Sequence, residues 1–378
     1  MKTPLAWLNL MHEKTRLMVA SSGVAFAVLL VFMNLGFLES LSKAAALTYE
    51  QLNAEVFLVS PQTTDISGTD TFPRERLYQA AGIEGVDRVM PVYIGFQQWR
   101  NLETRQSRAM FIYAINPEDP VFLLPELQLS ENQAALRRPD TVLMDQLSRP
   151  EYGPQKIGLT TELNRRKVKI GGLFSFGGGF SADGTLIMSD QNFRRFFDPR
   201  PLSEIDLGLI KLEVGADTSQ VVEKLQAILP KDVLVLTREQ IGTREGDYWI
   251  SATSTGFYFG LGVVVSLVVG TVIVYQILYT DISNHLLQYA TLKAMGYGSY
   301  YLFTIVIQEA VILAVLGYIP GFALSLGLYE LTFRATSIPI GMDLERATFV
   351  LILSVVMCVV SGLVSVQKVI AADPAEVF

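Results

Sequence analysis

The chain has 378 residues; half are hydrophobic and only 18% are charged, whereas soluble proteins usually carry about a quarter charged residues. Its mean hydropathy is +0.34 and its net charge is −7, so the composition indicates membrane segments and excludes the basic footprint of a nucleic-acid-binding protein. The single cysteine, Cys358, excludes an intrachain disulfide and a cysteine-based metal site, and the two histidines, His12 and His285, are far apart in sequence.

Residues 1–16, MKTPLAWLNLMHEKTR, are predicted to form a cytosolic interfacial helix. Thr3 suits the N-cap and Pro4 the first helical position. Leu5, Leu8 and Met11 form an apolar face that can lie on the inner membrane surface. The first span is predicted at residues 17–41. Its apolar run is longer than the core of a signal peptide, so we interpret it as a retained transmembrane helix.

Residues 42–250 have the composition of a soluble domain, and their pattern predicts an α+β fold. A strand at 54–60, a short helix opened by Pro73 and a strand at 86–99 make a first strand–helix–strand unit. A second unit has a strand at 205–214, a helix at 217–229 and a strand at 232–236. These units predict an α+β core at 44–115 and 202–245, with an inserted part at 116–201 that is richer in turns and short strands.

The second predicted helix has a clear amphipathic pattern. Its apolar face is predicted to consist of Val221, Val222, Leu225 and Ile228, and either Asp217 or Thr218 suits its N-cap.

The inserted part contains the glycine-rich run GGLFSFGGGFSADGTLIMSDQNF at 171–193. A phosphate-binding loop needs a lysine directly after its last glycine, and no Gly-Lys dipeptide occurs in the chain. We therefore interpret the run as a turn-rich loop, with Asp183-Gly184 as a hairpin turn. The chain also lacks G-x-S-x-G and H-E-x-x-H sequences. These observations predict no catalytic, cofactor-binding or metal-binding residues and no ATPase of the phosphate-loop type.

The second span is predicted at residues 251–280 and contains Gly256 and Gly260, small residues that allow membrane helices to approach closely. A half-polar stretch, DISNHLLQYATLKAMG, follows within a predicted cytosolic segment at 281–300. A solvated connector would carry more charge, and a tight turn would need fewer residues. The stretch is therefore predicted to be a helix that contacts another protein.

The third span is predicted at residues 301–329, with Gly317 and Gly321 as packing residues. It also carries Glu309, which we expect near the inner membrane interface in a structural role, although an intramembrane carboxylate is a functional hypothesis by default. A periplasmic loop at 330–346 leads to the fourth span at 347–368, which contains Gly362, and to a cytosolic tail at 369–378.

Basic residues near the ends of the spans favour cytosolic termini. They are Lys2, Lys14, Arg16, Lys293 and Lys368. Four spans with both termini inside place the domain at 42–250 outside the membrane.

Several sequence blocks resemble permeases of the MacB/FtsX type, the mechanotransmission (type VII) class of ABC transporters. These blocks are LKAMGYGSYYL and the ending ADPAEVF. The position of Glu309 early in the third span, and the layout of one span, a large domain and three spans, also resemble that family. Within that family the likeness is strongest to DevC-type permeases of cyanobacterial exporters. It is carried by PLAWLNLMHEKTRLMVASSGVAFAVLLVFMNLGF, INPEDPVFLLPE and SADGTLIMSDQNF.

The resemblance implies a non-catalytic homodimeric permease of a bacterial inner membrane with a periplasmic domain. It also implies that the core at 44–115 and 202–245 is porter-like and that the inserted part at 116–201 is β-rich. ATP would be bound by a separate ABC ATPase, and the periplasmic domain would engage an adaptor and, through it, a TolC-like outer-membrane protein. In that family ATPase motion drives the periplasmic domains to push cargo outward, and the DevC likeness suggests a (glyco)lipid cargo. The first and second spans would form the seam of the dimer.

The resemblance also assigns the half-polar stretch as the helix that seats on the ATPase. The residues expected to couple to the ATPase are Ile282, His285, Leu286, Tyr289, Leu292, Lys293, Met295 and Gly296. Asn284, His285 and Gln288 stand where the family is usually basic, so apolar and aromatic side chains would carry more of the contact.

Two other activities of similar permeases remain open from the sequence. One is an FtsX-like signalling permease that controls a periplasmic hydrolase, and the other is a lipoprotein-releasing permease that works without an adaptor. A membrane-tethered enzyme is the least favoured hypothesis.

Overall fold

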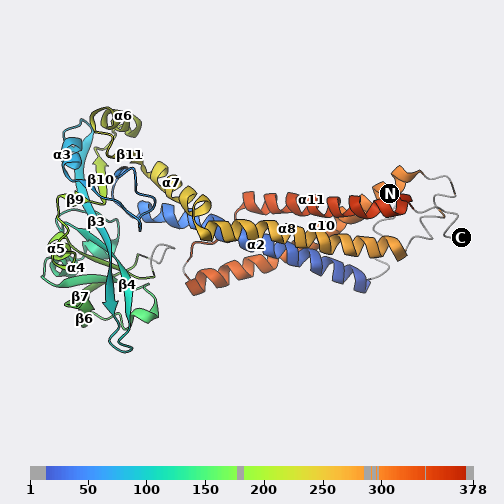
Figure 1. Cartoon of the computed structure of the whole chain (residues 1–378), viewed down its shortest axis with the longest axis horizontal. Helices are drawn as coiled ribbons and strands as arrows, with labels where there is room; N and C mark the ends of the chain where they lie inside the picture. The colour runs from blue at the N-terminus through green and yellow to red at the C-terminus, as the bar shows by residue number, and fades with distance from the viewer. Residues whose placement is uncertain are drawn as a thin grey trace. The chain divides into compact units, whose positions relative to one another are not determined.

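The computed structural model describes residues 14–176, 183–284, 291, 295, 298–336 and 338–371. They form two compact units (Figure 1). The soluble unit covers Leu41–Thr253, and the helical unit holds the described residues up to Ser40 and most of those from Ser254 onward. Residues 1–13, which include most of the predicted interfacial helix, lie outside the described residues.

The helical unit is a bundle of four long helices that run side by side (Figure 1). They are α2 (Lys14–Glu50), α8 (Ser254–Asn284), α10 (Ser299–Thr336) and α11 (Leu344–Ala371). All four are long and apolar enough to cross a membrane. The prediction of four spans, with a large domain between the first and the second, is confirmed.

The soluble unit is built on a sheet that has nine strands in the described residues, in the order β11-β1-β10-β3-β4-β8-β5-β7-β6. Its strands are β1 (Val56–Val59), β3 (Val86–Arg100), β4 (Ser107–Ile115), β5 (Thr141–Asp145), β6 (Thr160–Leu163), β7 (Arg166–Phe174), β8 (Thr185–Ser189), β10 (Leu207–Leu212) and β11 (Leu234–Thr237). The β4–β8 and β5–β7 pairs are parallel, and the other pairs are antiparallel. Two short strands, β2 (Phe72–Pro73) and β9 (Glu204–Ile205), pair separately.

Strand β3 belongs to both halves of this sheet because it is 15 residues long. Its first half pairs with β10, and near its end Trp99 pairs with Leu163 of β6. The second pairing closes β3, β4, β8, β5, β7 and β6 into a ring. The strands of the predicted inserted part, β5 to β8, all lie in this ring, and β11, β1 and β10 lie outside it.

Five α-helices accompany the sheet. They are α3 (Glu75–Ala81), α4 (Ser130–Leu136), α5 (Asp190–Phe196), α6 (Thr218–Ile228) and α7 (Arg238–Ser251), with two 3-10 turns at Pro125–Gln128 and Pro150–Tyr152. Strand β1 lies outside the ring, and it shows why helices cover both faces of the sheet there. Its side chains alternate, so Val56 and Leu58 join one buried cluster and Phe57 and Val59 join another. Both sets need an apolar cover, which α3 and α6 provide on one face and the end of α2 with α7 on the other.

The expected amphipathic helix is present as α6. Asp217 is its N-cap and accepts hydrogen bonds from the N–H groups of Ser219 and Gln220. Val221, Val222 and Leu225 are buried as predicted, but the prediction for Ile228 is wrong because its side chain is 58% exposed. Ile228 is the last helical residue, where no neighbouring element covers it.

The predicted hairpin turn at Asp183-Gly184 is also wrong. Strands β7 and β8 flank this segment, but they are not partners, because β5 lies between them in the sheet. Strands β7 and β8 follow one another in the sequence, but β5, which comes earlier in the chain, lies between them in the sheet. Residues 177–182 of the glycine-rich run lie outside the described residues.

Candidate functional site

Two predicted packing glycines bring α10 against α2. A Cβ atom at Gly317 would lie 2.4 Å from the Cβ of Val24, and one at Gly321 would lie 2.8 Å from the carbonyl oxygen of Ala25. These distances leave no room for a side chain, so the two helix backbones are in close contact.

The other three predicted packing glycines differ among themselves. A Cβ at Gly362 would make an ordinary contact, 3.4 Å from the Cβ of Ala310, whereas one at Gly260 would point into open space. Gly256 is buried. A contact that the sequence analysis missed is Gly270 of α8, whose Cβ would lie 2.7 Å from the Cβ of Ala27. The sequence could have indicated this contact, because Gly270 is a small residue in the middle of an apolar run.

Four polar side chains tie three of the bundle helices together. We call them the Arg346 cluster: Arg346 of α11, Glu39 of α2, Tyr329 of α10 and Asp343. The Arg346 guanidinium donates to the Glu39 carboxylate at 3.0 Å through Nε, and its side chain is 5% exposed. Its Nη1 donates to the carbonyl oxygen of Gly341 at 2.6 Å and lies 3.3 Å from the Tyr329 hydroxyl.

Tyr329 completes the Arg346 cluster, because its hydroxyl donates to the carbonyl oxygen of Phe32 on α2. Asp343 lies 3.6 Å from the Arg346 guanidinium. The charges near the ends of the spans predicted only which side of the membrane each loop lies on. They could not predict that Arg346 pairs with Glu39, because the two residues are 307 positions apart.

The residues predicted to couple to an ATPase are described only in part. Ile282 is buried in the bundle with Ile305, Val306 and Val366, whereas Met295 is 64% exposed. The other six lie outside the described residues: His285, Leu286, Tyr289, Leu292, Lys293 and Gly296. Glu309 is fully buried on α10.

The end of α2 packs on α7 through small residues, and we call this the α2–α7 contact. A Cβ at Gly242 would lie 3.3 Å from the Cα of Ala46, and one at Gly246 would lie 3.1 Å from the Cα of Ser42. Each helix thus presents two small residues four positions apart, a spacing that places them on one helix face. The sequence analysis missed this contact, although Gly242 and Gly246 show the same spacing as the glycines it selected.

Glu245 lies in the same contact and is 2% exposed. Its Oε2 accepts hydrogen bonds from the Tyr49 hydroxyl at 2.6 Å and from the N–H of Ile66 at 3.1 Å. Its Oε1 is buried and has no hydrogen-bond partner in the part of the chain that the structure describes. Burial, together with the nearby charge of Asp65, raises the pKa of Glu245 to about 7, although the hydrogen bonds to its carboxylate, that of Tyr49 above all, oppose the shift.

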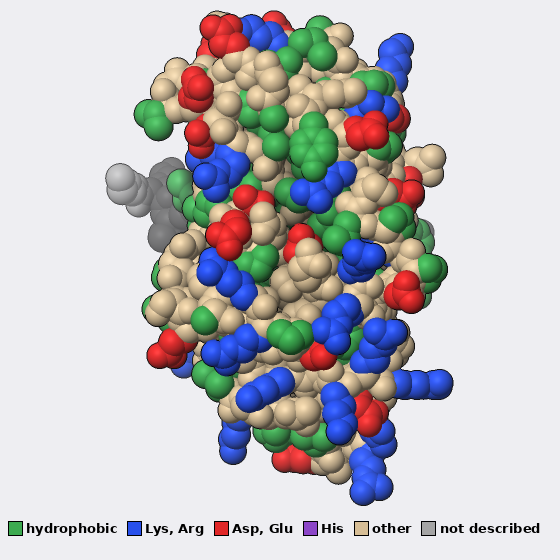
Figure 2. Space-filling view, turned by 90° about the vertical axis from the view of Figure 1, so that its left-hand side faces the viewer, with side chains coloured by type: hydrophobic (Ala, Val, Ile, Leu, Met, Phe, Trp, Pro, Cys, Tyr) green, Lys and Arg blue, Asp and Glu red, His purple; other side chains and the backbone are tan. Residues whose placement is uncertain are grey.

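The soluble unit also carries a basic pocket of about 510 Å³, which we call the arginine pocket. It is lined by Arg137, Arg138, Pro139, Arg166, Ser189, Gln191, Asn192, Arg194, Arg195 and Asp198. In Figure 2, Lys and Arg side chains gather over the lower half of this face, the half in which Figure 1 places α4, α5 and β7. None of the pocket residues was predicted, because its arginines lie in three separate segments.

No group of three or more metal-ligating side chains is found among the described residues.

The helical unit matches a known family model. Residues 260–374 match the family model described as "FtsX-like permease C-terminal". Among curated proteins, none matches the chain significantly.

Among solved structures, three similar folds are permease domains. The periplasmic region of MacB from Actinobacillus actinomycetemcomitans is 13% identical, with a TM-score of 0.36 over 50% of this chain and 90% of that one. The extracellular domain of the noncanonic ABC-type transporter YknZ from Gram-positive bacteria is 11% identical, with a TM-score of 0.34 over 49% of this chain and 99% of that one. A domain of a putative permease from Porphyromonas gingivalis is 14% identical, with a TM-score of 0.32 over 50% and 88%.

Proposed function

The chain is an ABC-type permease of the MacB/FtsX family, with the FtsX-like C-terminal domain at residues 260–374, and on this premise we propose that it transmits the motion of a partner ATPase to its soluble domain. The family match, which covers three of the four spans, is the observation that carries the proposal. The chain is a multi-pass membrane protein that is not itself the ATPase, and the soluble domain lies on the periplasmic side.

The form of α2 supports a mechanical role. It is one helix of 37 residues, about 55 Å long at 1.5 Å per residue, whereas a bilayer core needs only about 20 residues. Its last turns belong to the soluble unit, where they pack on α7. The first connection between the spans and the soluble domain is therefore one continuous helix, and the second is short, because α7 ends two residues before α8 begins.

ATP in this proposal is bound by a separate ABC ATPase, and two copies of the chain form the membrane-embedded dimer. The ATPase docks on the cytosolic segment at 281–300, where Met295 is exposed. The segment lacks the positive charge common in similar permeases, so apolar contacts dominate the docking.

On the periplasmic side, we propose that the soluble domain engages an adaptor protein and, through it, a TolC-like outer-membrane protein. The exported cargo is of the (glyco)lipid class. The resemblance to DevC-type permeases is the support for both statements.

Photocross-linking tests the docking. A photoreactive amino acid at Met295 should capture a cytosolic ATPase, whereas the same group at Tyr78, an exposed residue of the soluble domain, should not. The copurified complex should hydrolyse ATP, and the chain alone should not. ATP hydrolysis by the chain alone, or capture of the ATPase from position 78, would contradict the proposal.

The identity of the copurified periplasmic proteins then separates the related activities. An adaptor with a TolC-like protein supports the exporter. A periplasmic hydrolase activated without any cargo indicates a signalling permease, and released lipoprotein without an adaptor indicates a lipoprotein-releasing permease.

A further inference from the structure

The arginine pocket gathers positive charge on a protein that is negative overall. Five of its ten lining residues are arginines and one, Asp198, is acidic. The arginines come from the end of α4 (Arg137, Arg138), the start of β7 (Arg166) and the last turn of α5 (Arg194, Arg195). Like charges repel, so a fold that converges them from three segments needs a negative partner to offset the repulsion.

Intrachain carboxylates offset only part of this charge. Arg137 pairs with Glu118 at 2.9 Å, and Arg195 pairs with Asp140 at 3.0 Å. Arg138, Arg166 and Arg194 have no carboxylate within salt-bridge distance among the residues that the structure describes. These are the three unpaired arginines of the pocket. The five arginines, set against Glu118, Asp140 and Asp198, leave a surplus of two positive charges.

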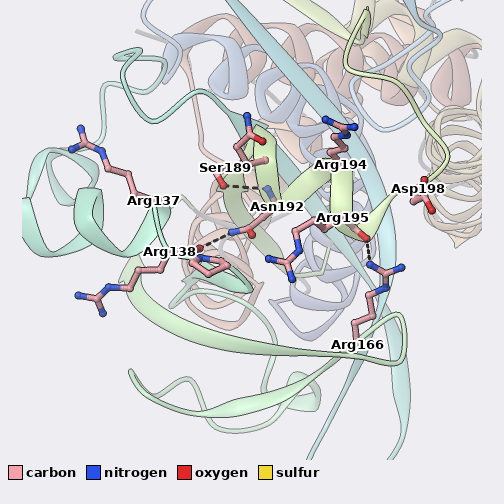
Figure 3. Close-up of a pocket in the computed structure, with 10 residues that line it drawn as sticks. Arg137, Arg138, Arg166, Ser189, Asn192, Arg194, Arg195 and Asp198 are labelled. Carbon is pink, nitrogen blue, oxygen red and sulfur yellow. Dashed lines mark hydrogen bonds between the residues drawn. The ribbon is translucent and has the colours of Figure 1, made fainter.

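The floor of the pocket is held in place by Asn192, which is 1% exposed (Figure 3). Its Nδ2 donates to the carbonyl oxygens of Arg138 and Thr141 at 3.0 Å each, and its Oδ1 accepts from the N–H of Asp140 at 2.9 Å. Its own N–H donates to the Oγ of Ser189, the N-cap of α5. These bonds fix the loop after α4 against α5.

The third segment is fixed to α5 as well. Arg166 donates from Nη1 to the carbonyl oxygen of Arg195, as the dashed line in Figure 3 shows. Within the pocket, the Asn192 bonds therefore position the backbone at Arg138, and the bond to Arg195 holds the guanidinium of Arg166 itself, whereas the other guanidinium groups lie on exposed side chains. This arrangement reduces the conformational entropy that the pocket loses when a ligand binds.

We infer that the arginine pocket is a binding site for a phosphate-bearing headgroup. A phosphate monoester carries about −1.5 to −2 charges at neutral pH, which matches the surplus of two, and its oxygens accept the paired N–H groups of guanidinium. The volume of about 510 Å³ falls in the range of small-molecule sites and holds more than a phosphate ion alone. The inference does not depend on the transport activity proposed above.

The experiment uses the full chain in a detergent without phosphate. Its affinity is measured by calorimetry for inorganic phosphate, glycerol 3-phosphate and short-chain phosphatidic acid, with sulfate at equal ionic strength as a reference. The test variant is Arg138→Gln/Arg166→Gln/Arg194→Gln. The control Arg76→Gln/Lys224→Gln/Lys231→Gln removes the same charge from α3, α6 and the following loop.

The expected result is that the phosphate ligands bind the native chain and the control within twofold of each other, and that the test variant binds about tenfold more weakly or worse. Tighter binding of phosphatidic acid than of inorganic phosphate identifies a lipid headgroup as the source, and equal affinities identify free phosphate. All altered residues are exposed except Arg76, so unchanged thermal unfolding is expected and is checked for each variant.

Three results would overturn the inference. One is the absence of phosphate binding to the native chain, and another is an equal loss of affinity in the control. The third is capture of an acidic protein through the same arginines without any phosphate binding, which would make the pocket a protein-docking surface.

Discussion

At the scale of single residues, burial decides the chemistry of Glu245. The carboxyl group accepts two hydrogen bonds through one oxygen, while its other oxygen is buried and has no hydrogen-bond partner among the described residues. Removal of a charged group from water favours its neutral form. The folded protein therefore holds a proton on Glu245 at pH values where an unfolded chain would release it.

The Glu245→Gln substitution tests this protonation. Because the folded pKa of about 7 lies above the ordinary value of 4.5, the contribution of Glu245 to stability is full below pH 4.5 and is lost as pH rises through 7. Glutamine is neutral at every pH, so the gain of the variant over the native chain should be small at pH 5 and should reach at most on the order of 3 kcal/mol at pH 8. Thermal unfolding at both pH values measures this difference, and parallel pH profiles for the two proteins would refute it.

Gly321 and Gly260 provide a matched pair for close helix packing. In Gly321→Ala the new Cβ would meet the Ala25 carbonyl oxygen at 2.8 Å, whereas in Gly260→Ala it meets open space. Overpacking costs about 1–3 kcal/mol, so Gly321→Ala should unfold at a lower temperature, and Gly260→Ala should be as stable as the native chain or slightly more stable. Equal unfolding temperatures for the two variants would mean that the α2 and α10 backbones are not in contact.

At the scale of elements, helices are joined in two ways: by small residues and by buried polar groups. Close backbone contacts connect α10 with α2 and α7 with α2, and the Arg346 cluster connects α2, α10 and α11. Helix α2 takes part in each of these connections. Its residues also belong to both compact units, since the division between the units falls after Ser40.

Replacement of Arg346 by Met should weaken the bundle markedly. It removes the Arg346 partner of Glu39, and because Glu39 is 36% exposed, the cost should stay below the roughly 3–5 kcal/mol for breaking a fully buried pair. Arg334→Met is the control, since its pair with Glu330 is exposed on both sides and is worth about 0.5 kcal/mol or less. Unfolding of both variants in detergent measures the contrast. A loss of stability in Arg334→Met as large as in Arg346→Met would contradict it.

The α2–α7 contact is predicted to move as one body. A Cβ at Gly242 would lie 3.3 Å from that of Ala46, close to the separation of about 3.5–4.5 Å found in disulfides. Ala46→Cys/Gly242→Cys should therefore form a disulfide on oxidation and leave stimulation of the partner ATPase unchanged. Loss of stimulation that a reducing agent restores would show that the two helices slide during the cycle.

At the scale of the whole molecule, the proposed function requires a cytosolic docking segment and a periplasmic domain on opposite sides of the membrane. Cys358 is the single cysteine of the chain, so Cys358→Ala gives a background without cysteine. In intact cells, a membrane-impermeant maleimide should label a cysteine at Tyr78 and not one at Met295, and both should react after lysis. Labelling of position 295 in intact cells would place the docking segment on the wrong side and exclude the proposed function.

Local patterns in the sequence were enough for the spans and for much of the soluble domain. A run of about 20 apolar residues crosses a bilayer whatever surrounds it, and the missing Gly-Lys dipeptide excludes a phosphate loop in any fold. The N-cap at Asp217 and the buried face of α6 follow from spacing within one helix. The porter-like and inserted parts stay predictions at their stated boundaries.

Only the tertiary structure decided which distant segments meet. Four features join residues far apart in the chain. They are the pairing of Arg346 with Glu39, the position of β5 between β7 and β8, the contact of Gly246 with Ser42, and the arginines that meet from α4, α5 and β7. The protonation of Glu245 has the same origin, because it depends on burial by α2 and by the segment around Ile66. Hydrophobic periodicity is a local property, whereas these contacts depend on how the elements pack together, which no local pattern encodes.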